Sequence, residues 1–292
     1  MTHILSGTNI KEEIKSHLKD VALEIDEKIS LVIIQVGERD DSSAYIKHKK
    51  KFGSDIGVNV IHSQFPERTS EEDIIDEIQK YNNDQDVYGI ILQLPIPEYL
   101  DRHRIIEAID KHKDIDGLTS FSISRLYAHK PVLVPATARG VVSLLDYYDI
   151  ELEGKHAVVI GRSELAGMPI GLSLLSRNAT VTMCHSYTQD LENITKTADI
   201  LVVAAGVPHL ITKKYLKKDA VVIDVGIHNV SDPKAESEIP GKKYTGDVDF
   251  DKVKEKASYI TPVPGGVGPM TISMLLKNTL LARELHRKRK NL

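Results

Sequence analysis

A tyrosine and a lysine four positions apart are the first residues of this chain whose spacing suggests catalysis. Tyr45 and Lys49 lie in the stretch SSAYIKHKKK, residues 42–51, which we expect to be helical. A helix places side chains at this spacing on one face, one turn apart. A phenol beside an ammonium group can lower the pKa of the lysine if the pocket is also apolar. The pair therefore suggests general acid or base chemistry near neutral pH.

The other lysines of this stretch leave a second interpretation open. Lys47, Lys50 and Lys51 point elsewhere around the expected helix, so their default role is a solvated face. They could also bind a polyanion, which would make the chain a non-enzymatic RNA-binding protein. A single basic patch binds weakly and with strong salt dependence. Aromatic side chains that could stack on bases are scarce, since the chain has no Trp and only 4 Phe.

Two later segments supply polar groups that could act with the lysine. In GIILQLPIP an almost wholly apolar strand ends at Gln93, followed by Leu94 and Pro95. Ligands of open α/β sheets bind at such carboxyl ends. The segment KDIDGLTS carries Asp114 and Asp116, but two carboxylates without further oxygen ligands make a poor metal site. We therefore predict no metal, and a turn in which one carboxylate is available to a ligand.

The segment AVVIGRSELAGMPIGLSLL has the strand, turn and helix of a dinucleotide site. Gly161 ends the strand where the backbone must turn sharply. Gly167 and Pro169 lie at the start of the helix, whose N–H groups and dipole attract a pyrophosphate. The pattern differs from G-x-G-x-x-G, so an ordinary strand-to-helix turn is the alternative.

The next strand favours NADP over NAD. It ends in TMCHSYT, without the acidic residue that commonly binds the ribose 2′-hydroxyl of NAD. His185 and Ser186 can instead donate hydrogen bonds to a 2′-phosphate, and Arg162 can approach the same group. A surface histidine at a strand end is the alternative for His185. Ser163, in the first turn, completes the predicted phosphate contacts.

Small residues follow two further strands of the second half. Ala205 and Gly206 end one strand, and Gly226 and Ile227 follow the other. In a parallel sheet these positions share the carboxyl edge, where a nicotinamide ribose and ring would lie.

Apolar β-branched runs alternate with amphipathic segments along the whole chain. This alternation predicts an α/β fold with parallel sheets buried on both faces. Ser70, with Asp73 three residues later, is expected to cap one of the helices. We predict a catalytic domain over residues 1–140, completed by a C-terminal helix over 270–292, and a Rossmann-like nucleotide domain over 141–269.

Composition limits the compartment and the partners. The 38 basic and 42 acidic residues give a net charge of −4, which argues against a general nucleic-acid binder. The single cysteine, Cys184, fits a reducing compartment. No segment has the apolar length of a membrane span or the pattern of a secretory signal. We expect a cytoplasmic protein that binds neither membrane nor nucleic acid.

Eight segments together resemble the bifunctional methylenetetrahydrofolate dehydrogenase/methenyltetrahydrofolate cyclohydrolase family. In family order they are SAYIKHKKK, GIILQLPIP, KDIDGLTS, VVIGRSELAGMP, VTMCHS, DVGIH, GDVDF and ITPVPGGVGPMT. The resemblance covers essentially the whole chain. One departure is the segment PATARG, residues 135–140, where the family commonly has PCTP-x-G between the domains.

The resemblance implies a folate substrate and a role for each residue of the first half. The pterin would stack over Tyr45, Asp116 would hold its amino and ring N–H groups, and Lys49 would be the catalytic lysine, tuned by Gln93. Pro264, Gly265 and Gly266 would line the same cleft, between the two domains. The resemblance also implies NADP as cofactor and a homodimer.

Two enzyme alternatives remain. A short-chain reductase also uses Tyr-x-x-x-Lys, but that family places its nucleotide turn before the pair, whereas Gly161 follows Tyr45 here. A monofunctional dehydrogenase of the folate family is closer. Such variants tend to lose the lysine, and Lys49 is present.

Overall fold

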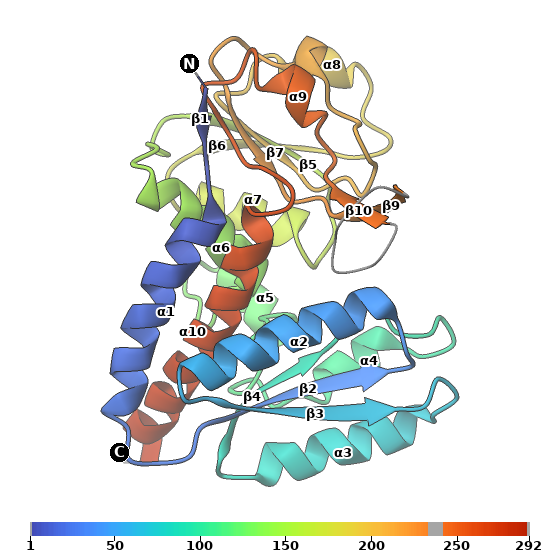
Figure 1. The fold of residues 1–292 in the computed structure, drawn as a ribbon, viewed down its shortest axis with the longest axis vertical. Coiled ribbons are helices and arrows are strands. Elements are labelled where there is room, and N and C mark those ends of the chain that lie inside the picture. The colour runs from blue at the N-terminus through green and yellow to red at the C-terminus, as the bar shows by residue number, and fades with distance from the viewer. Residues whose placement is uncertain (1, 233–241, 291–292) are drawn as a thin grey trace. The chain divides into compact units, whose positions relative to one another are not determined.

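The computed structural model describes residues 2–232 and 242–290, and it divides into two compact units (Figure 1). The large-sheet unit comprises Met1–Glu12 and Thr137–Thr271. The small-sheet unit comprises Glu13–Ala136 and Ile272–Leu292. The predicted α/β class with parallel sheets is confirmed in both.

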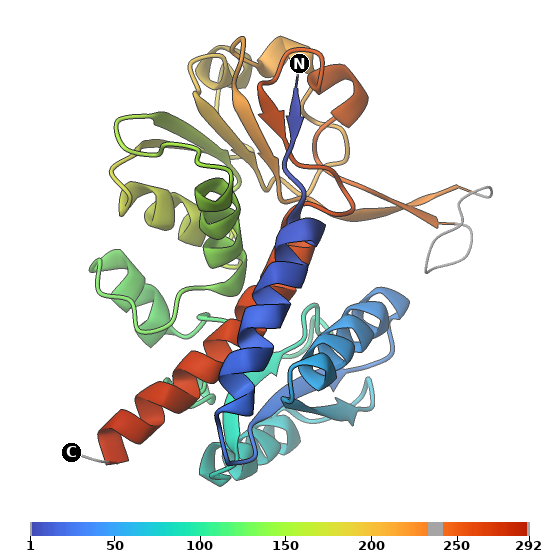
Figure 2. The ribbon, with the colours of Figure 1, turned by 60° about the vertical axis from the view of Figure 1, so that its left-hand side comes forward.

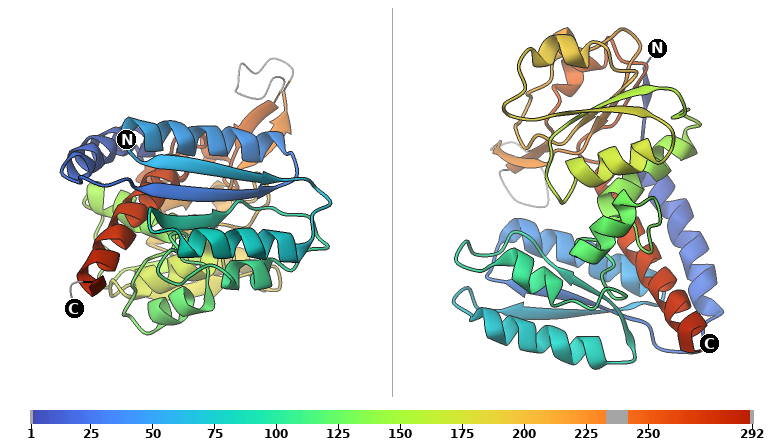
Figure 3. Two further views of the ribbon diagram at one scale, coloured as in Figure 1. Left: turned by 90° about the horizontal axis from the view of Figure 1, so that it is seen from below. Right: turned by 180° about the vertical axis from the view of Figure 1, so that it is seen from behind.

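The small-sheet unit is built on the parallel strands β2 (Ser30–Val36), β3 (Asn59–Phe65) and β4 (Val87–Leu92), in the order β3-β2-β4. Every residue of β2 and β4 is buried, as expected for strands covered on both faces. Helix α2 (Asp40–Asp55) covers one face of the sheet and α3 (Glu71–Asn83) covers the other (Figure 3). Isoleucine and valine side chains of the strands and of α3 form the core.

Helix α3 begins where the sequence predicts. The Ser70 hydroxyl accepts a hydrogen bond from Asp73 N at 3.1 Å and donates one to the Asp73 carboxylate at 2.6 Å. This pair satisfies an N–H group that has no partner within the helix. Two short helices, α4 (Arg102–Glu107) and α5 (Ser120–Tyr127), also belong to this unit.

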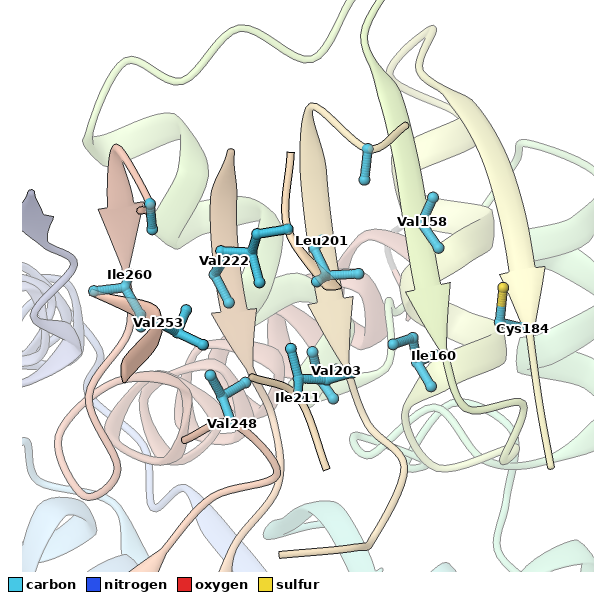
Figure 4. Close-up of a cluster of buried hydrophobic side chains, with 13 residues drawn as sticks. Val158, Ile160, Cys184, Leu201, Val203, Ile211, Val222, Val248, Val253 and Ile260 are labelled. Carbon is cyan, nitrogen blue, oxygen red and sulfur yellow. The ribbon is translucent and has the colours of Figure 1, made fainter. Parts of the chain in front are cut away.

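The large-sheet unit contains a six-stranded sheet in which all neighbouring strands pair in parallel. Across the sheet the strands are β1 (His3–Ile4), β11 (Tyr259–Ile260), β8 (Val221–Asp224), β7 (Ile200–Val203), β5 (His156–Ile160) and β6 (Thr180–Cys184). Apolar side chains from five of these strands pack together with Val248 and Val253 (Figure 4). The remaining elements of the unit are α6 (Ala136–Tyr147), α7 (Gly167–Leu175), α8 (Leu191–Thr195), η1 (Lys213–Tyr215), the antiparallel pair β9 (His228–Ser231) and β10 (Lys242–Thr245), and α9 (Phe250–Val253).

The strand order of this sheet reverses between β5 and β7. From β5 the chain first adds β6 on one side, and then adds β7, β8 and β11 on the other. In open α/β sheets, ligands bind outside the carboxyl ends of the strands at such a reversal. The turns that follow β5 and β7 therefore lie where the predicted dinucleotide site is expected.

Two long helices contribute residues to both units. Helix α1 (Gly7–Leu23) passes from the large-sheet to the small-sheet unit after Glu12, and α10 (Val267–Lys290) does so after Thr271. Within the small-sheet unit the two helices lie side by side (Figure 2). There Arg283 of α10 pairs with Glu27, just beyond α1.

The units differ from the predicted domain ranges at the N-terminus. Residues 2–12 belong to the large-sheet unit because β1 pairs in parallel with β11. The boundary after Ala136 lies close to the predicted residue 140. Ile272 and the residues that follow it belong to the small-sheet unit, and residues 291–292 of the predicted C-terminal helix lie outside the described residues.

Helix α6 includes most of the segment PATARG, and α10 begins earlier than predicted. Residues 136–140 of PATARG form the start of α6. Ala136 and Ala138 are fully buried there, so the segment is packed and is not an exposed linker. Helix α10 begins at Val267, earlier than the predicted residue 270, with Pro269 in its first turn. Proline is tolerated there because the first N–H groups of a helix have no helical partner.

No helix in the described part of the chain is both long enough and apolar enough to cross a membrane.

Candidate active site

Lys49 forms one end of a short hydrogen-bonded chain in the small-sheet unit. It lies on α2 with 8% of its surface exposed, and its Nζ donates to Gln93 Oε1 at 2.8 Å. The Gln93 amide nitrogen donates to Leu94 O at 2.9 Å, which fixes the orientation of the amide. Burial lowers the pKa of Lys49 to about 8, although the Asp116 carboxylate opposes this shift. A lysine with this pKa can donate or accept a proton near neutral pH.

Asp116 is the second titratable group of the site. Burial raises the pKa of Asp116 to about 6; the Lys49 ammonium lowers it, and the charge of Asp114 raises it further. Its side chain remains partly exposed. Near neutral pH the pair is therefore mainly an ammonium and a carboxylate, and burial disfavours the charge on each.

Asp114 has a different role from Asp116, although only one residue separates them. It is 1% exposed, and its carboxylate accepts hydrogen bonds from Gly117 N at 2.9 Å and Leu118 N at 3.1 Å. It also accepts hydrogen bonds from the backbone and hydroxyl of Thr119. Asp114 thus shapes the turn, and the role of Asp116 as a ligand contact stays a prediction.

Sequence reasoning misses the residue that ties this turn to α10. Asn278, which is fully buried, donates through Nδ2 to Ile115 O at 2.7 Å and to Val134 O at 2.9 Å. Ile115 directly precedes Asp116, so Asn278 fixes the backbone from which the carboxylate extends. The available signal is a lone asparagine within the apolar helix segment ISMLLKNTLL.

Tyr45 lies one turn before Lys49 on α2 and is half-buried. Lys47, Lys50 and Lys51 are exposed. The helical spacing and the solvated basic face are therefore as predicted. The structure brings Lys49 together with Gln93 and Asp116, with Tyr45 on the same helix.

The other predicted folate contacts are divided between the two units. Leu94 and Pro95 directly follow β4, and the peptide bond between them is cis. Pro264–Gly266 belong to the large-sheet unit, in the turn before α10. There Gly265 O accepts hydrogen bonds from the first two N–H groups of α1, at 2.9 and 3.1 Å.

Glycines close the turn after β5 because backbone atoms approach each other there. Gly161 has a φ of +114°, and a Cβ on it would lie 2.0 Å from Ala204 O. A Cβ on Gly167 would lie 2.1 Å from Gly161 O. Neither position accepts a side chain. Gly167 begins α7 and Pro169 lies in its first turn, an arrangement that suits a bound phosphate.

Polar side chains follow β5 and β6 in the large-sheet unit. Arg162, Ser163 and Ser186 are exposed, and His185 is partly exposed. His185 Nδ1 accepts a hydrogen bond from Tyr187 N at 3.2 Å, so we assign the ring proton to Nε2, which remains a donor. The Arg162 guanidinium lies 5.9 Å from the centre of the Tyr187 ring. These side chains can supply donors to a ribose 2′-phosphate.

The small residues that follow β7 and β8 lie as predicted beyond the ends of neighbouring strands. Ala205 and Gly226 are half-buried, while Gly206 and Ile227 are exposed. The tight turn after β5 and these small residues leave backbone accessible at the strand reversal. The residues present therefore fit a dinucleotide with a 2′-phosphate.

Two buried carboxylates beside these turns are absent from the sequence prediction. Asp224 is 3% exposed and accepts hydrogen bonds from the N–H groups of Gly226, Asp247 and Val248 at 2.9–3.0 Å. Burial raises the pKa of Asp224 to about 7 despite these bonds. Asp247 is fully buried. The available signal for Asp224 is its position at the end of the apolar run AVVID, whereas Asp247 follows KKYTG and has no such signal.

In the described part of the chain, no group of three or more His, Cys, Asp or Glu side chains could hold a metal ion.

Two family models match the chain. The catalytic domain of tetrahydrofolate dehydrogenase/cyclohydrolase matches residues 5–116, and the NAD(P)-binding domain of the same family matches residues 135–287. The chain is 46% identical to the bifunctional protein FolD of Oceanobacillus iheyensis over 285 residues, 97% of each chain. It is also 46% identical to that of Thermodesulfovibrio yellowstonii, over 96% of this chain and 94% of the relative.

Solved structures give the same result. The bifunctional FolD enzyme of Campylobacter jejuni superposes with a TM-score of 0.90 at 38% identity, over 98% of this chain and 100% of that one. The Trypanosoma brucei FolD enzyme, solved in complex with NADP cofactor and an inhibitor, superposes with a TM-score of 0.94 at 35% identity, over 98% of each chain.

Proposed function

Because this chain belongs to the tetrahydrofolate dehydrogenase/cyclohydrolase family, we propose that it catalyses two consecutive reactions on one folate. The first is the NADP-dependent oxidation of 5,10-methylenetetrahydrofolate to 5,10-methenyltetrahydrofolate. The second is the hydrolysis of the methenyl compound to 10-formyltetrahydrofolate. Both activities are implied by the bifunctional relatives that match nearly the full length of the chain.

The oxidation mainly requires positioning. A hydride leaves the methylene carbon, and the lone pairs of the two neighbouring nitrogens stabilise the cation that forms. NADP+, when bound, supplies the hydride acceptor. The turn after β5 would hold its pyrophosphate, and Arg162, His185 and Ser186 would hold its 2′-phosphate. No proton transfer by the protein is needed, so the large-sheet unit contributes binding and orientation.

The hydrolysis requires proton transfer, and the small-sheet unit supplies the group for it. Water adds to the methenyl carbon and gives up both of its protons: the leaving nitrogen gains one as its bond to that carbon breaks, and the other is released to solvent. Lys49 can mediate this exchange because its pKa is lowered to about 8. Gln93 holds its Nζ in place. Asp116 would bind the pterin N–H groups, and Tyr45 would stack on the pterin ring.

One observation carries this proposal: a buried lysine with a lowered pKa, hydrogen-bonded to an amide and electrostatically coupled to a carboxylate. A solvated basic helix face would need none of these features. Lys50, the next residue of α2, is exposed and illustrates the difference.

A two-wavelength assay tests the proposal. The purified protein is incubated with 5,10-methylenetetrahydrofolate and either NADP+ or NAD+, and reduced nicotinamide and methenyl folate are followed by their separate absorbances. We expect NADP+ to be reduced while little methenyl compound accumulates. Accumulation of the methenyl compound would indicate a monofunctional dehydrogenase. The absence of both signals would refute the proposed function.

We also propose that the chain forms a homodimer in the cytoplasm. Exposed apolar side chains on α6 and α7, Tyr147 at 43% and Leu175 at 46% exposure, offer a surface for a second copy. The only cysteine of the sequence is buried and not in a disulfide, which suits a reducing compartment. Light scattering of the purified protein would give twice the mass of the chain, and the monomer mass would refute the dimer.

A further inference from the structure

Asp247 joins two segments that are distant in the sequence. Its Oδ2 accepts hydrogen bonds from Ala205 N at 2.6 Å and Gly206 N at 3.0 Å, in the turn after β7. Its Oδ1 lies 2.7 Å from Nε2 of His228, which follows β8. A carboxylate only accepts hydrogen bonds, so Nε2 carries a proton. One fully buried side chain thus connects both turns assigned to the nicotinamide end of the cofactor.

The second buried carboxylate holds Asp247 itself. Asp224 Oδ1 accepts a hydrogen bond from Asp247 N at 3.0 Å, and Asp224 Oδ2 accepts one from Val248 N at 2.9 Å. The carbonyl of Asp247 accepts a further bond from Ile211 N at 3.0 Å. The backbone of Asp247 is therefore fixed on both sides, and its carboxylate cannot follow a movement of the turns.

Glycines at two positions leave the space that these carboxylates fill. A Cβ on Gly226 would lie 2.4 Å from Asp247 Cγ, and a Cβ on Gly246 would lie 1.9 Å from Asp224 Oδ2. Any side chain there would displace a carboxylate. The segments DVG and GDVD are thus complementary in shape as well as in hydrogen bonding.

The hydrogen bonds to Asp247 restrict how the turn after β7 can contact a ligand. The N–H groups of Ala205 and Gly206 point to the buried carboxylate and are no longer available to a cofactor. At these two residues the turn can offer only carbonyl oxygens and small apolar surfaces. Such a surface suits a flat ring that must approach closely and remain oriented for hydride transfer.

Building on the proposed dehydrogenase function, we propose that Asp247 is a positioning residue for hydride transfer. It holds the turn after β7 and the His228 ring in the arrangement that orients the nicotinamide. It does not touch the substrate, and its effect is confined to one of the two activities. Cyclohydrolase activity, which depends on Lys49 in the small-sheet unit, does not require it.

The substitution Asp247→Asn tests this proposal. It keeps the size of the side chain but presents an amide N–H₂ group to N–H donors. We expect kcat/KM of the dehydrogenase to fall on the order of 100-fold, the cost of a small misplacement of reacting groups. The loss should appear in kcat, with the Kd of NADP+ changed by less than about threefold because the phosphate contacts remain. Hydrolysis of added methenyl folate should be unchanged.

Two further variants keep the test decisive. His228→Phe removes one of the three bonds to Asp247 and should lower dehydrogenase kcat about tenfold. His228→Phe replaces Asp247→Asn as the test if Asp247→Asn does not fold. Asp249→Asn is the matched control, because Asn caps a helix as well as Asp does and the Asp249 carboxylate bonds Lys252, which lies outside both turns. It should leave both activities unchanged.

The outcomes separate this inference from the proposed function. If the wild-type protein reduces NADP+ and Asp247→Asn does so equally well, the positioning role is refuted. A parallel loss of both activities would also refute it, because it would show a general structural role. If the wild-type protein itself does not reduce NADP+, the proposed dehydrogenase function fails instead.

Discussion

Asp247 and Asp224 of the large-sheet unit and Asp116 of the small-sheet unit are held in opposite ways. In the large-sheet unit, Asp247 is surrounded by three hydrogen-bond donors, and Asp224 accepts three backbone N–H groups. In the small-sheet unit, the pKa of Asp116 is set by burial and by the charges of Lys49 and Asp114, with no contribution from hydrogen bonds. The first arrangement fixes a shape, and the second leaves charge that a ligand can use.

This difference matches the two reactions. Hydride transfer requires two reactants to be held at the correct distance and angle, which saturated hydrogen bonds favour. Hydrolysis requires a group that gains and loses a proton near neutral pH, which burial of a poorly compensated ion pair favours. The comparison predicts that substitutions in one unit affect mainly one activity.

The strongest test of this separation is Lys49→Met. Removing the proton-transfer group should lower cyclohydrolase activity by about 100- to 10,000-fold, the usual contribution of general acid–base catalysis. Part of the dehydrogenase activity should remain, because that reaction needs no proton. Methenyl folate should then accumulate during oxidation, which its absorbance detects.

The adjacent residue provides the control for this substitution. Lys50→Met removes the same charge from the same helix at an exposed position, and should leave both activities within about twofold of the wild type. An equal loss of both activities in Lys49→Met would contradict the proposed division between the units.

A smaller effect is expected for Arg162→Gln in the large-sheet unit. A charged hydrogen bond to phosphate contributes about 1.5–3 kcal/mol, so the Kd of NADP+ should rise about 10- to 100-fold. The Kd of NAD+, which lacks the 2′-phosphate, should change little, and so should cyclohydrolase activity. Isothermal titration calorimetry measures both constants.

Arg177→Gln is the matched variant in the same unit. Arg177 makes a two-point hydrogen bond with Asp146 and has no assigned part in nucleotide binding. It should leave both constants unchanged. Equal weakening of NADP+ and NAD+ in Arg162→Gln would show that Arg162 does not recognise the 2′-phosphate.

The sequence predicts the elements of both sites better than the bonds between them. Strands such as β2 and β7 follow from local apolar runs, and Lys49 follows from helical spacing. The partners of Asp247 lie 19 to 42 positions away, and Asn278 bonds a carbonyl 163 positions away. No local pattern encodes such pairings. Strand β1 was missed for a related reason, since its two residues are too short for any periodicity.

Asn278→Leu tests whether the turn that carries Asp116 is held by α10. The change leaves the carbonyls of Ile115 and Val134 without this donor, which should lower the free energy of unfolding by about 2–4 kcal/mol. Urea denaturation measures the loss. Thr279→Val is the control, because its buried hydroxyl bonds only Leu275 O of the same helix and should cost under about 1 kcal/mol. Equal costs for the two variants would contradict this role of Asn278.

The smallest expected effect is the pH dependence of the wild-type protein. Lys49 has a pKa of about 8 and Asp116 one of about 6, so both are mainly charged only between these values. If the ammonium of Lys49 donates the proton, cyclohydrolase kcat/KM should fall up to about tenfold per pH unit above 8. The dehydrogenase, which uses neither proton, should show no such decline over the same range. The two apparent pKa values belong to the coupled pair. Lys49→Met should therefore remove the fall of cyclohydrolase kcat/KM at alkaline pH, and it should also shift the pH below which this activity declines. An alkaline limb shared by both activities would place its origin outside the Lys49 site.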